Sequence, residues 1–137
     1  MNNKPPLINE DGRQQRDFVS VHDIARACRL AMEEPAAAGE VFNIGSGRSF
    51  SILEIAEQMA AVLGKEELEA RITGKYRVGD IRNCFADISR ARRILGYEPR
   101  VTLAEGLENL AEWLEGQIPL DQVDAAQEEL EARGLTV

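Results

Sequence analysis

The sequence contains few of the residues that build metal centres or disulfide frameworks. It has two cysteines and one histidine in 137 residues. Cys28 and Cys84 are far apart, so neither a disulfide framework nor a thiolate metal site is indicated. We expect both to be reduced, packed thiols, Cys28 on the apolar side of a helix and Cys84 inside a strand. A lone histidine such as His22 is typical of a capping or packing residue. No metal site is expected.

The sequence also lacks the familiar catalytic sets. No Ser/His/Asp constellation is evident, and neither tyrosine is followed four residues later by a lysine. At that spacing Asp80 follows Tyr76, and Val101 follows Tyr97. Because proton transfer needs a positioned acid or base, no catalytic residue is predicted on this chain.

A glycine-rich turn is present but incomplete as a dinucleotide motif. Gly45-Ser46-Gly47 follows a short apolar segment and opens onto a helix, which is where dinucleotide folds hold phosphate. A G-x-G-x-x-G fingerprint needs a third glycine at position 50, which is Phe50. Ser51 and Glu54 instead form a capping box for the helix. The turn is therefore predicted to be structural first, and no cofactor-binding residue is expected.

Positive charge is scarce. The chain has 24 acidic residues against 16 lysines and arginines, which gives a net charge of −8. Nucleic acids and anionic membranes bind basic faces, so neither is expected as a partner. No apolar run approaches the length that spans a bilayer, and the segment from Met1 to Pro6 has no apolar leader core. We therefore expect a cytoplasmic protein.

What the sequence does have is enough apolar residues, 44% of the chain, to bury a sizeable core. Short apolar strands alternate with capped helices, which predicts an α/β fold with a few short strands flanked by helices. The first helix is predicted to be capped by Asp23 and to bury a stripe that includes Cys28 and Met32. The predicted strands cover 16–21, 40–44 and 70–73, with an extended segment over 81–86, and the helices cover 23–33, 51–63, 89–95 and 103–115. Gly96 is predicted to end the third helix, and Thr102 forms a capping box for the fourth. The strands over 16–21 and 40–44 are predicted to be sandwiched by the first, second and fourth helices.

The last part of the chain has a different composition. Residues 121–133 are acidic and weakly amphipathic through Val123, Ala126 and Leu130. We therefore predict two units, a folded part over 1–116 and an acidic tail over 117–137 that is helical, either loosely docked or frayed.

The stretch from Gly74 to Arg82 is rich in polar side chains around a glycine turn. Arg77 and Asp80 lie three residues apart, and Gly79 between them allows a sharp turn. A guanidinium fork suits phosphate oxygens and a carboxylate suits sugar hydroxyls, so one reading is a nucleotide or sugar-phosphate clamp. The other is a surface turn with a weak ion pair.

The predicted strand 16–21 offers a second candidate surface. Alternation along this strand places Arg16 and Phe18 on the same face. An arginine beside an aromatic ring could bind a diphosphate and its nucleoside. The same face could equally be a polar edge.

Taken in order, these segments resemble a known family. The motifs are E-D-G over 10–12, R-D-F-V-x-V-x-D over 16–23, F-N-I-G-S-G over 42–47, R-V-G-D over 77–80, and A-D over 86–87 followed by L-G-Y over 95–97 and Pro99. They resemble the C-terminal part of the NAD-dependent nucleotide-sugar epimerases and dehydratases, which are extended short-chain dehydrogenases/reductases typified by UDP-glucose 4-epimerase. The run over 79–87 is most similar to the bacterial 4-epimerases that act on UDP- or dTDP-sugars. The resemblance covers roughly residues 5–116.

The resemblance implies roles for five residues. Arg16 and Arg77 would bind the diphosphate of the nucleotide-sugar, and Asp80 would bind its ribose. Phe18 and Ile52 would line the nucleoside pocket. These roles agree with the grouping of Arg16 with Phe18, and of Arg77 with Asp80, that the residues themselves suggest.

The family's glycine-rich NAD loop and its Tyr-x-x-x-Lys lie in an N-terminal part that these 137 residues do not contain. The resemblance therefore implies the substrate-binding part of a 4-epimerase, as a fragment or as a derivative that kept only this part. In the intact enzyme, NAD, bound mainly by the N-terminal part, would oxidise the sugar at C4 and return the hydride to the other face. We expect this chain alone to be inactive and to hold no NAD tightly.

Two alternatives remain open from the sequence. The chain could be a stand-alone nucleotide-sugar-binding module, or a protein-interaction domain that uses its acidic tail helix. In the family this part packs against the nucleotide-binding half, so the absence of that half would leave apolar strand residues uncovered. A homo-oligomer is therefore expected, in which those strands or the stripe of the 103–115 helix meet a second copy. The residues concerned are Val19, Val21, Phe42 and Ile44.

Overall fold

The computed structural model describes residues 3–118 and 120–136 and shows a mixed α/β chain. This confirms the predicted fold class. The elements in order are β1 (Leu7–Ile8), β2 (Gln15–Arg16), α1 (Val21–Glu33), the 3-10 turn η1 (Pro35–Ala37), β3 (Phe50–Ser51), α2 (Ile52–Val62), β4 (Arg71–Ile72), β5 (Asn83–Cys84), α3 (Ser89–Leu95), α4 (Leu103–Glu115) and α5 (Val123–Ala132).

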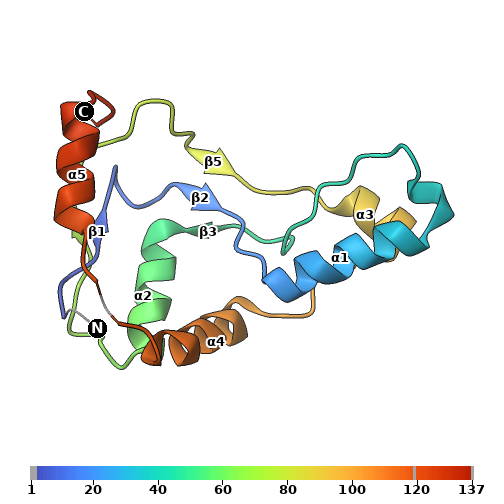
Figure 1. Cartoon of the computed structure of the whole chain (residues 1–137), viewed down its shortest axis with the longest axis horizontal. Helices are drawn as coiled ribbons and strands as arrows, with labels where there is room; N and C mark the ends of the chain where they lie inside the picture. The colour runs from blue at the N-terminus through green and yellow to red at the C-terminus, as the bar shows by residue number, and fades with distance from the viewer. Residues whose placement is uncertain (1–2, 119, 137) are drawn as a thin grey trace.

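The strands of the described residues form two small sheets. β1 pairs with β4 in parallel, and β2 lies between β3, to which it is antiparallel, and β5, to which it is parallel. The β3-β2-β5 sheet lies in the middle of the molecule, with α1 and α3 towards one end and α2, α4 and α5 towards the other (Figure 1).

Two predicted strands are wrong in extent or existence. The strand expected over 16–21 is regular only over β2, and the segment 40–44 runs as irregular chain. A strand exists only where a neighbour completes its hydrogen-bond ladder. Within the described residues, the carbonyl of Val41 accepts instead from the side chain of Arg90, at 3.1 Å. The predicted sandwich of both strands between helices is therefore not formed.

The helix boundaries follow their local signals, with one correction. Ser51 and Thr102 both form the predicted capping boxes, and Gly96 ends α3 in the left-handed conformation. α1, however, begins at Val21 and is capped by Ser20, not by Asp23. The Asp23 side chain is instead buried, 2% exposed, and serves a tertiary contact.

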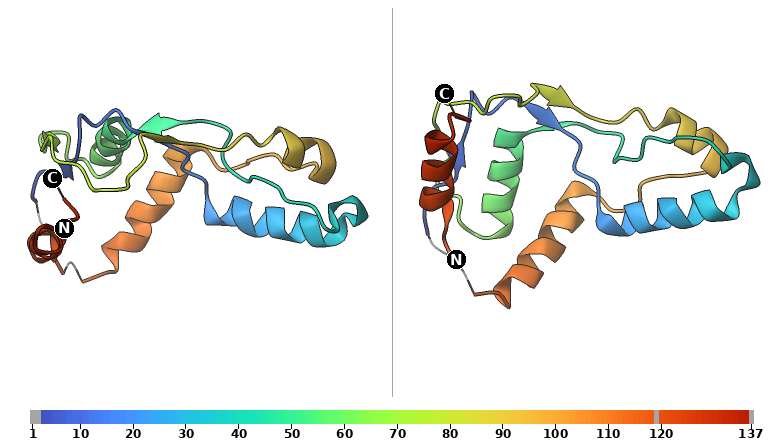
Figure 2. Two further views of the ribbon diagram at one scale, coloured as in Figure 1. Left: turned by 90° about the horizontal axis from the view of Figure 1, so that it is seen from above. Right: turned by 45° about the horizontal axis from the view of Figure 1, so that its top comes forward.

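The core lies between α1 and α3, which pack side by side at one end (Figure 2). The buried face of α1 is centred on Ala27, whereas Cys28 is exposed and Met32 is 81% exposed. The predicted burial of Cys28 and Met32 is therefore wrong. Cys84 is also exposed, so its predicted packing is wrong, although it lies in β5 as expected for a strand residue. The buried members of the core are Ala27, Ala37, Ile88, Ala91, Leu95 and Tyr97.

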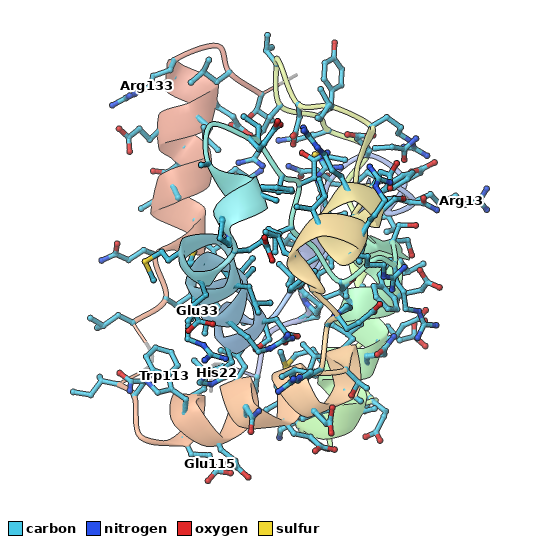
Figure 3. The ribbon with its side chains drawn as sticks, turned by 90° about the vertical axis from the view of Figure 1, so that its right-hand side faces the viewer. Arg13, His22, Glu33, Trp113, Glu115 and Arg133 are labelled. Atoms are coloured by element: carbon cyan, nitrogen blue, oxygen red, sulfur yellow. The ribbon has the colours of Figure 1, made fainter. Side chains whose placement is uncertain are left out.

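At the other end α2 packs against α4, and α5 runs beside β1 (Figure 1). The helical character of the tail is thus confirmed over Val123–Ala132. Trp113 on α4 is 61% exposed (Figure 3). In the described part of the chain, no helix combines the length and the apolar character that crossing a bilayer requires.

Candidate functional site

Arg16, at the end of β2, is held in a defined direction by carbonyl groups. Its Nη1 donates to Gln15 O at 2.8 Å and to Arg82 O at 3.1 Å, and its Nη2 donates to Ile81 O at 2.7 Å. The parallel pairing of β2 with β5 brings residues 81–82 alongside it. By contrast Arg13, three residues earlier, projects away from the molecule (Figure 3). The sheet therefore aims Arg16 at the 77–82 loop.

Asp80 lies between two guanidinium groups. Arg16 Nη2 donates to its Oδ1 at 3.2 Å, and Arg77 Nη2 donates to its Oδ2 at 3.2 Å. The side chains of Arg16, Arg77 and Asp80 are 25%, 55% and 34% exposed. Gly79 has φ +85°, a conformation that only glycine adopts freely, so it makes the turn between Arg77 and Asp80 possible. The expected turn that brings Arg77 and Asp80 together is therefore present, and it also places Asp80 against Arg16. The binding roles of these three residues stay predictions.

The charges of this cluster suit an anionic ligand that carries hydroxyl groups. Two arginines on one carboxylate leave an excess of positive charge. Arg16 already uses four of its five N–H donors, so most of the remaining donors belong to Arg77, whose side chain is 55% exposed. A diphosphate could bind both guanidinium groups, and the carboxylate could then accept from a hydroxyl. The contacts with the ligand would replace the ion pairs of Asp80 with Arg16 and Arg77, which are weak because these side chains are partly exposed to water.

Phe18 and Ile52 flank Arg16 along the chain and across the sheet. Phe18 comes two residues after Arg16 and is half-buried. Ile52 is the first residue of α2, and its N–H donates to Gln14 O at 3.1 Å, next to β2. Both therefore lie near Arg16 in the fold, and their lining of a nucleoside pocket stays a prediction.

Arg82 is a polar neighbour of the site that sequence reasoning missed. Its guanidinium donates to Asp11 Oδ1 at 2.7 Å, to Asp11 Oδ2 at 2.8 Å and to Glu10 Oε2 at 2.8 Å. These hydrogen bonds from Arg82, together with the amide of Arg13, hold the pKa of Asp11 well below its ordinary value. The signal in the sequence that could have revealed this contact was the acidic Glu10-Asp11-Gly12 turn together with Arg82, a further arginine next to the Arg77–Asp80 turn. Arg82 is engaged with these acids, which leaves Arg16 and Arg77 to the site.

The glycine turn over 45–47 does not fit a cofactor phosphate. Ser46 N already donates to Asp17 Oδ1 at 2.8 Å, and Gly45 O accepts from the hydroxyl of Tyr97 at 2.8 Å. A Cβ on Gly45 would stand 2.2 Å from Asp17 Oδ2, so glycine is required here by packing. These contacts give the turn a structural role among the described residues, and the expectation that it binds no cofactor stays a prediction.

Other candidate chemistry is not supported by the described part of the chain. His22 is exposed on the first turn of α1 (Figure 3), and no group of three or more His, Cys, Asp or Glu side chains able to hold a metal is found among those residues. A cavity of about 950 Å³ lies between the N-terminal segment, α2, α4 and the start of α5. None of the five predicted site residues lines it.

Comparisons with known proteins show the family of the chain. The family model of the GDP-mannose 4,6-dehydratases matches residues 1–110. The chain is 36% identical to dTDP-L-rhamnose 4-epimerase of Burkholderia thailandensis over 107 residues, which are 78% of this chain and 29% of that protein.

Solved structures give the same result. The UDP-glucose 4-epimerase of Thermotoga maritima, solved with UDP-glucose, superposes with a TM-score of 0.75 at 35% identity, over 82% of this chain and 35% of the other. The UDP-glucuronic acid 4-epimerase of Bacillus cereus, solved with NAD, gives a TM-score of 0.70 at 33% identity, over 82% and 35%. The chain thus spans about a third of the length of the relatives it matches. With the family model covering most of its length, the chain belongs to the NAD-dependent nucleotide-sugar epimerase/dehydratase family of extended short-chain dehydrogenases/reductases.

Proposed function

We propose that this chain is the nucleotide-sugar-binding part of an NAD-dependent 4-epimerase. The observation that carries the proposal is the placement of Asp80 between Arg16 and Arg77 on a half-exposed surface. Arg16 and Arg77 bind the diphosphate of a UDP- or dTDP-sugar, and Asp80 accepts from the ribose. Phe18 and Ile52 line the nucleoside pocket. The relatives named for UDP-glucose and dTDP-rhamnose support this class of ligand.

The hydride chemistry belongs to the intact enzyme. NAD would be bound by residues outside these 137, because the turn over 45–47 is filled by its own packing contacts. This chain alone therefore binds the nucleotide but neither holds NAD tightly nor turns over UDP-galactose. Measurable turnover by the pure chain, or NAD bound through its residues, would contradict this part of the proposal.

The test of binding is calorimetry with UDP and with dTDP. We expect Arg16→Ala to weaken binding, since Arg16 is aimed at the site by three carbonyl groups. The matched control is Arg13→Ala, which removes the same charge from a side chain directed away from the site (Figure 3). Equal losses in the two variants would mean that only net charge matters. No binding of either nucleotide by the unmodified chain would refute the proposal.

The homo-oligomer stays part of the proposal. Of the residues expected to be uncovered, Phe42 and Ile44 instead pack against the core, whereas Val21 is 76% exposed. Val41, beside Phe42, is 79% exposed, so apolar groups near α1 are available to a second copy. Sedimentation equilibrium at micromolar concentration measures the assembly. A monomer at all concentrations would show this part to be wrong.

A further inference from the structure

The loop that carries Arg77 and Asp80, residues 74–80, contains two glycines with positive φ. Gly74 has φ +72° and Gly79 has φ +85°, both in the region that favours glycine. At its first end the loop is fixed to the N-terminal segment, since Glu10 N donates to Lys75 O at 2.7 Å. Tyr76 and Val78 are 50% and 57% exposed, so side-chain packing does little to hold the middle of the loop.

The end of the chain holds the middle of this loop. Val78 N donates to Leu135 O at 2.9 Å, and Arg77 pairs with Thr136 as an antiparallel bridge. Lys75 forms an ion pair with Glu131 of α5, at 2.5 Å. Figure 1 shows the end of the chain beside the segment that leads to β5. These contacts link segments more than fifty residues apart, and they place Thr136 opposite Arg77.

The geometry of these contacts indicates support of the loop, not obstruction of the site. The C-terminal segment pairs with the backbone of residues 77–78 and leaves the Arg77 side chain 55% exposed and directed to Asp80. The cavity between loop and segment, about 270 Å³, is smaller than the pockets that hold drug-sized ligands. Its lining is Arg77, Val78, Gly79, Asp80, Leu130 and Leu135.

We propose that the C-terminal segment, residues 130–136, is a positioning element for the nucleotide site. It holds the 74–80 loop in the conformation in which Arg77 and Asp80 face Arg16. The proposal deepens the proposed function and rests on it for the ligand, a nucleoside diphosphate. A loop that is ordered before the ligand arrives loses less conformational entropy on binding, so the segment strengthens binding without touching the ligand.

The main experiment compares the whole chain with a chain that ends at Ala132 and with the double variant Leu130→Ala/Leu135→Ala. We expect the affinity for UDP or dTDP to fall roughly tenfold in both altered chains, because the loop would then lose conformational entropy when it becomes ordered on binding. The control is Leu120→Ala, since Leu120 is 79% exposed and lines neither cavity. Unchanged affinity would overturn the proposal, and tighter binding would show that the segment obstructs the site.

A second readout does not depend on the ligand. Amide hydrogen exchange of Val78, which donates to Leu135 O, should speed up in the shortened chain. The amides of the α1–α3 core should keep their rates. If Val78 exchanged at an unchanged rate, or if core amides accelerated equally, the segment would not be a specific support of the loop. Should the unmodified chain bind neither nucleotide, the proposed function fails, and this exchange measurement still decides the role of the segment.

A third readout separates positioning from general stability. If the segment acts through Arg77, shortening the chain should weaken binding much less in an Arg77→Ala background than in the unmodified chain. Additive losses would mean that the segment acts on binding by another route.

The ion pair between Lys75 and Glu131 is tested separately. Glu131→Gln is compared with Glu128→Gln, which neutralises an exposed residue of the same helix. Only Glu131→Gln should affect the exchange of residues 75–78.

Discussion

The α1–α3 end of the molecule and the loop around Arg77 and Asp80 are held together by different interactions. At the α1–α3 end, Ala91 and Tyr97 are fully buried. The loop has exposed ion pairs, two glycines in the left-handed region and a short backbone bridge. Burial of apolar area stabilises far more than exposed ion pairs do. The comparison shows a rigid end and an adaptable end, and the groups proposed to bind the ligand lie at the adaptable one.

Asp23 is the polar group on which the rigid end depends most. Its carboxylate, 2% exposed, accepts from the amides of Arg100 and Val101 at 2.9–3.1 Å and from Arg26 Nη2 at 2.6 Å. It thereby ties α1 to the segment that leads into α4. Burial alone would raise the pKa of Asp23, but the Val101 amide, the Arg26 guanidinium and the Arg100 amide outweigh it and lower the pKa.

The largest effect should come from breaking the rigid end with Asp23→Ala. The change leaves two amides and the Arg26 guanidinium without their buried acceptor, so we expect the free energy of unfolding to fall by about 3–5 kcal/mol. Urea denaturation measures it. Glu33→Ala on the same helix is the control, because its pair with Arg29 is exposed. Similar losses in both variants would mean that burial does not distinguish the two carboxylates.

The next largest effect should come from the adaptable end. Arg77→Ala should weaken binding of a nucleoside diphosphate by about 1.5–3 kcal/mol, the range for a charge-assisted hydrogen bond. Arg77→Lys should recover only part, since a point charge replaces a fork. Arg93→Ala, on the exposed face of α3, is the control. If calorimetry found a loss for Arg93→Ala and none for Arg77→Ala, the site would be misplaced.

Acid should weaken the rigid end through Asp23. The folded state lowers the pKa of this carboxyl below its ordinary value of 3.8, so the ionised form stabilises the fold. That contribution is complete above pH 3.8 and is lost as the pH falls through the lowered value. The difference in unfolding free energy between the unmodified protein and Asp23→Asn should therefore shrink at acid pH. A difference that stayed constant from pH 7 to acid would contradict the role of ionised Asp23.

The smallest effect is expected for Arg82→Gln. Arg82 hydrogen-bonds Glu10 and Asp11, but all three groups face water, and salt screens such pairs. We expect the urea midpoint to change very little, and we expect the change to be smaller in high salt than in low salt. If Arg82→Gln shifted the urea midpoint as much as Asp23→Ala does, the two ends would not differ in how they are stabilised. The Arg82–Glu10–Asp11 contacts would then be a main support of the loop.

Local signals in the sequence predicted the features that depend on near neighbours. The capping boxes at Ser51 and Thr102, the stop at Gly96 and the Arg77–Asp80 turn each need only a few consecutive residues. The resemblance placed Arg16 with this turn, and parallel pairing of β2 with β5 brings them together. The predictions that are wrong, such as the burial of Cys28 and Met32, depend on which distant segments pack or pair with the predicted element.

Orientation and pairing were decided by the tertiary structure. α1 turns Ala27 and Asp23 inward and leaves Cys28 and Met32 exposed, because small residues let α3 approach closely and Asp23 finds two amides far along the chain. The segment 40–44 has a strand-like sequence, yet within the described residues it has no ladder partner, and a strand without one is not formed.

The sequence by itself determined the family, the helix ends at Ser51, Gly96 and Thr102, and the turn that joins Arg77 to Asp80, since motif order, caps and turns are local. Only the tertiary structure decided that Arg82 is occupied by Glu10 and Asp11, that the turn over 45–47 is filled by Asp17 and Tyr97, and that the C-terminal segment pairs with the 77–78 backbone. These contacts join segments separated by tens of residues. The packing of the whole chain determines which segments form these contacts, so no local sequence pattern predicts them.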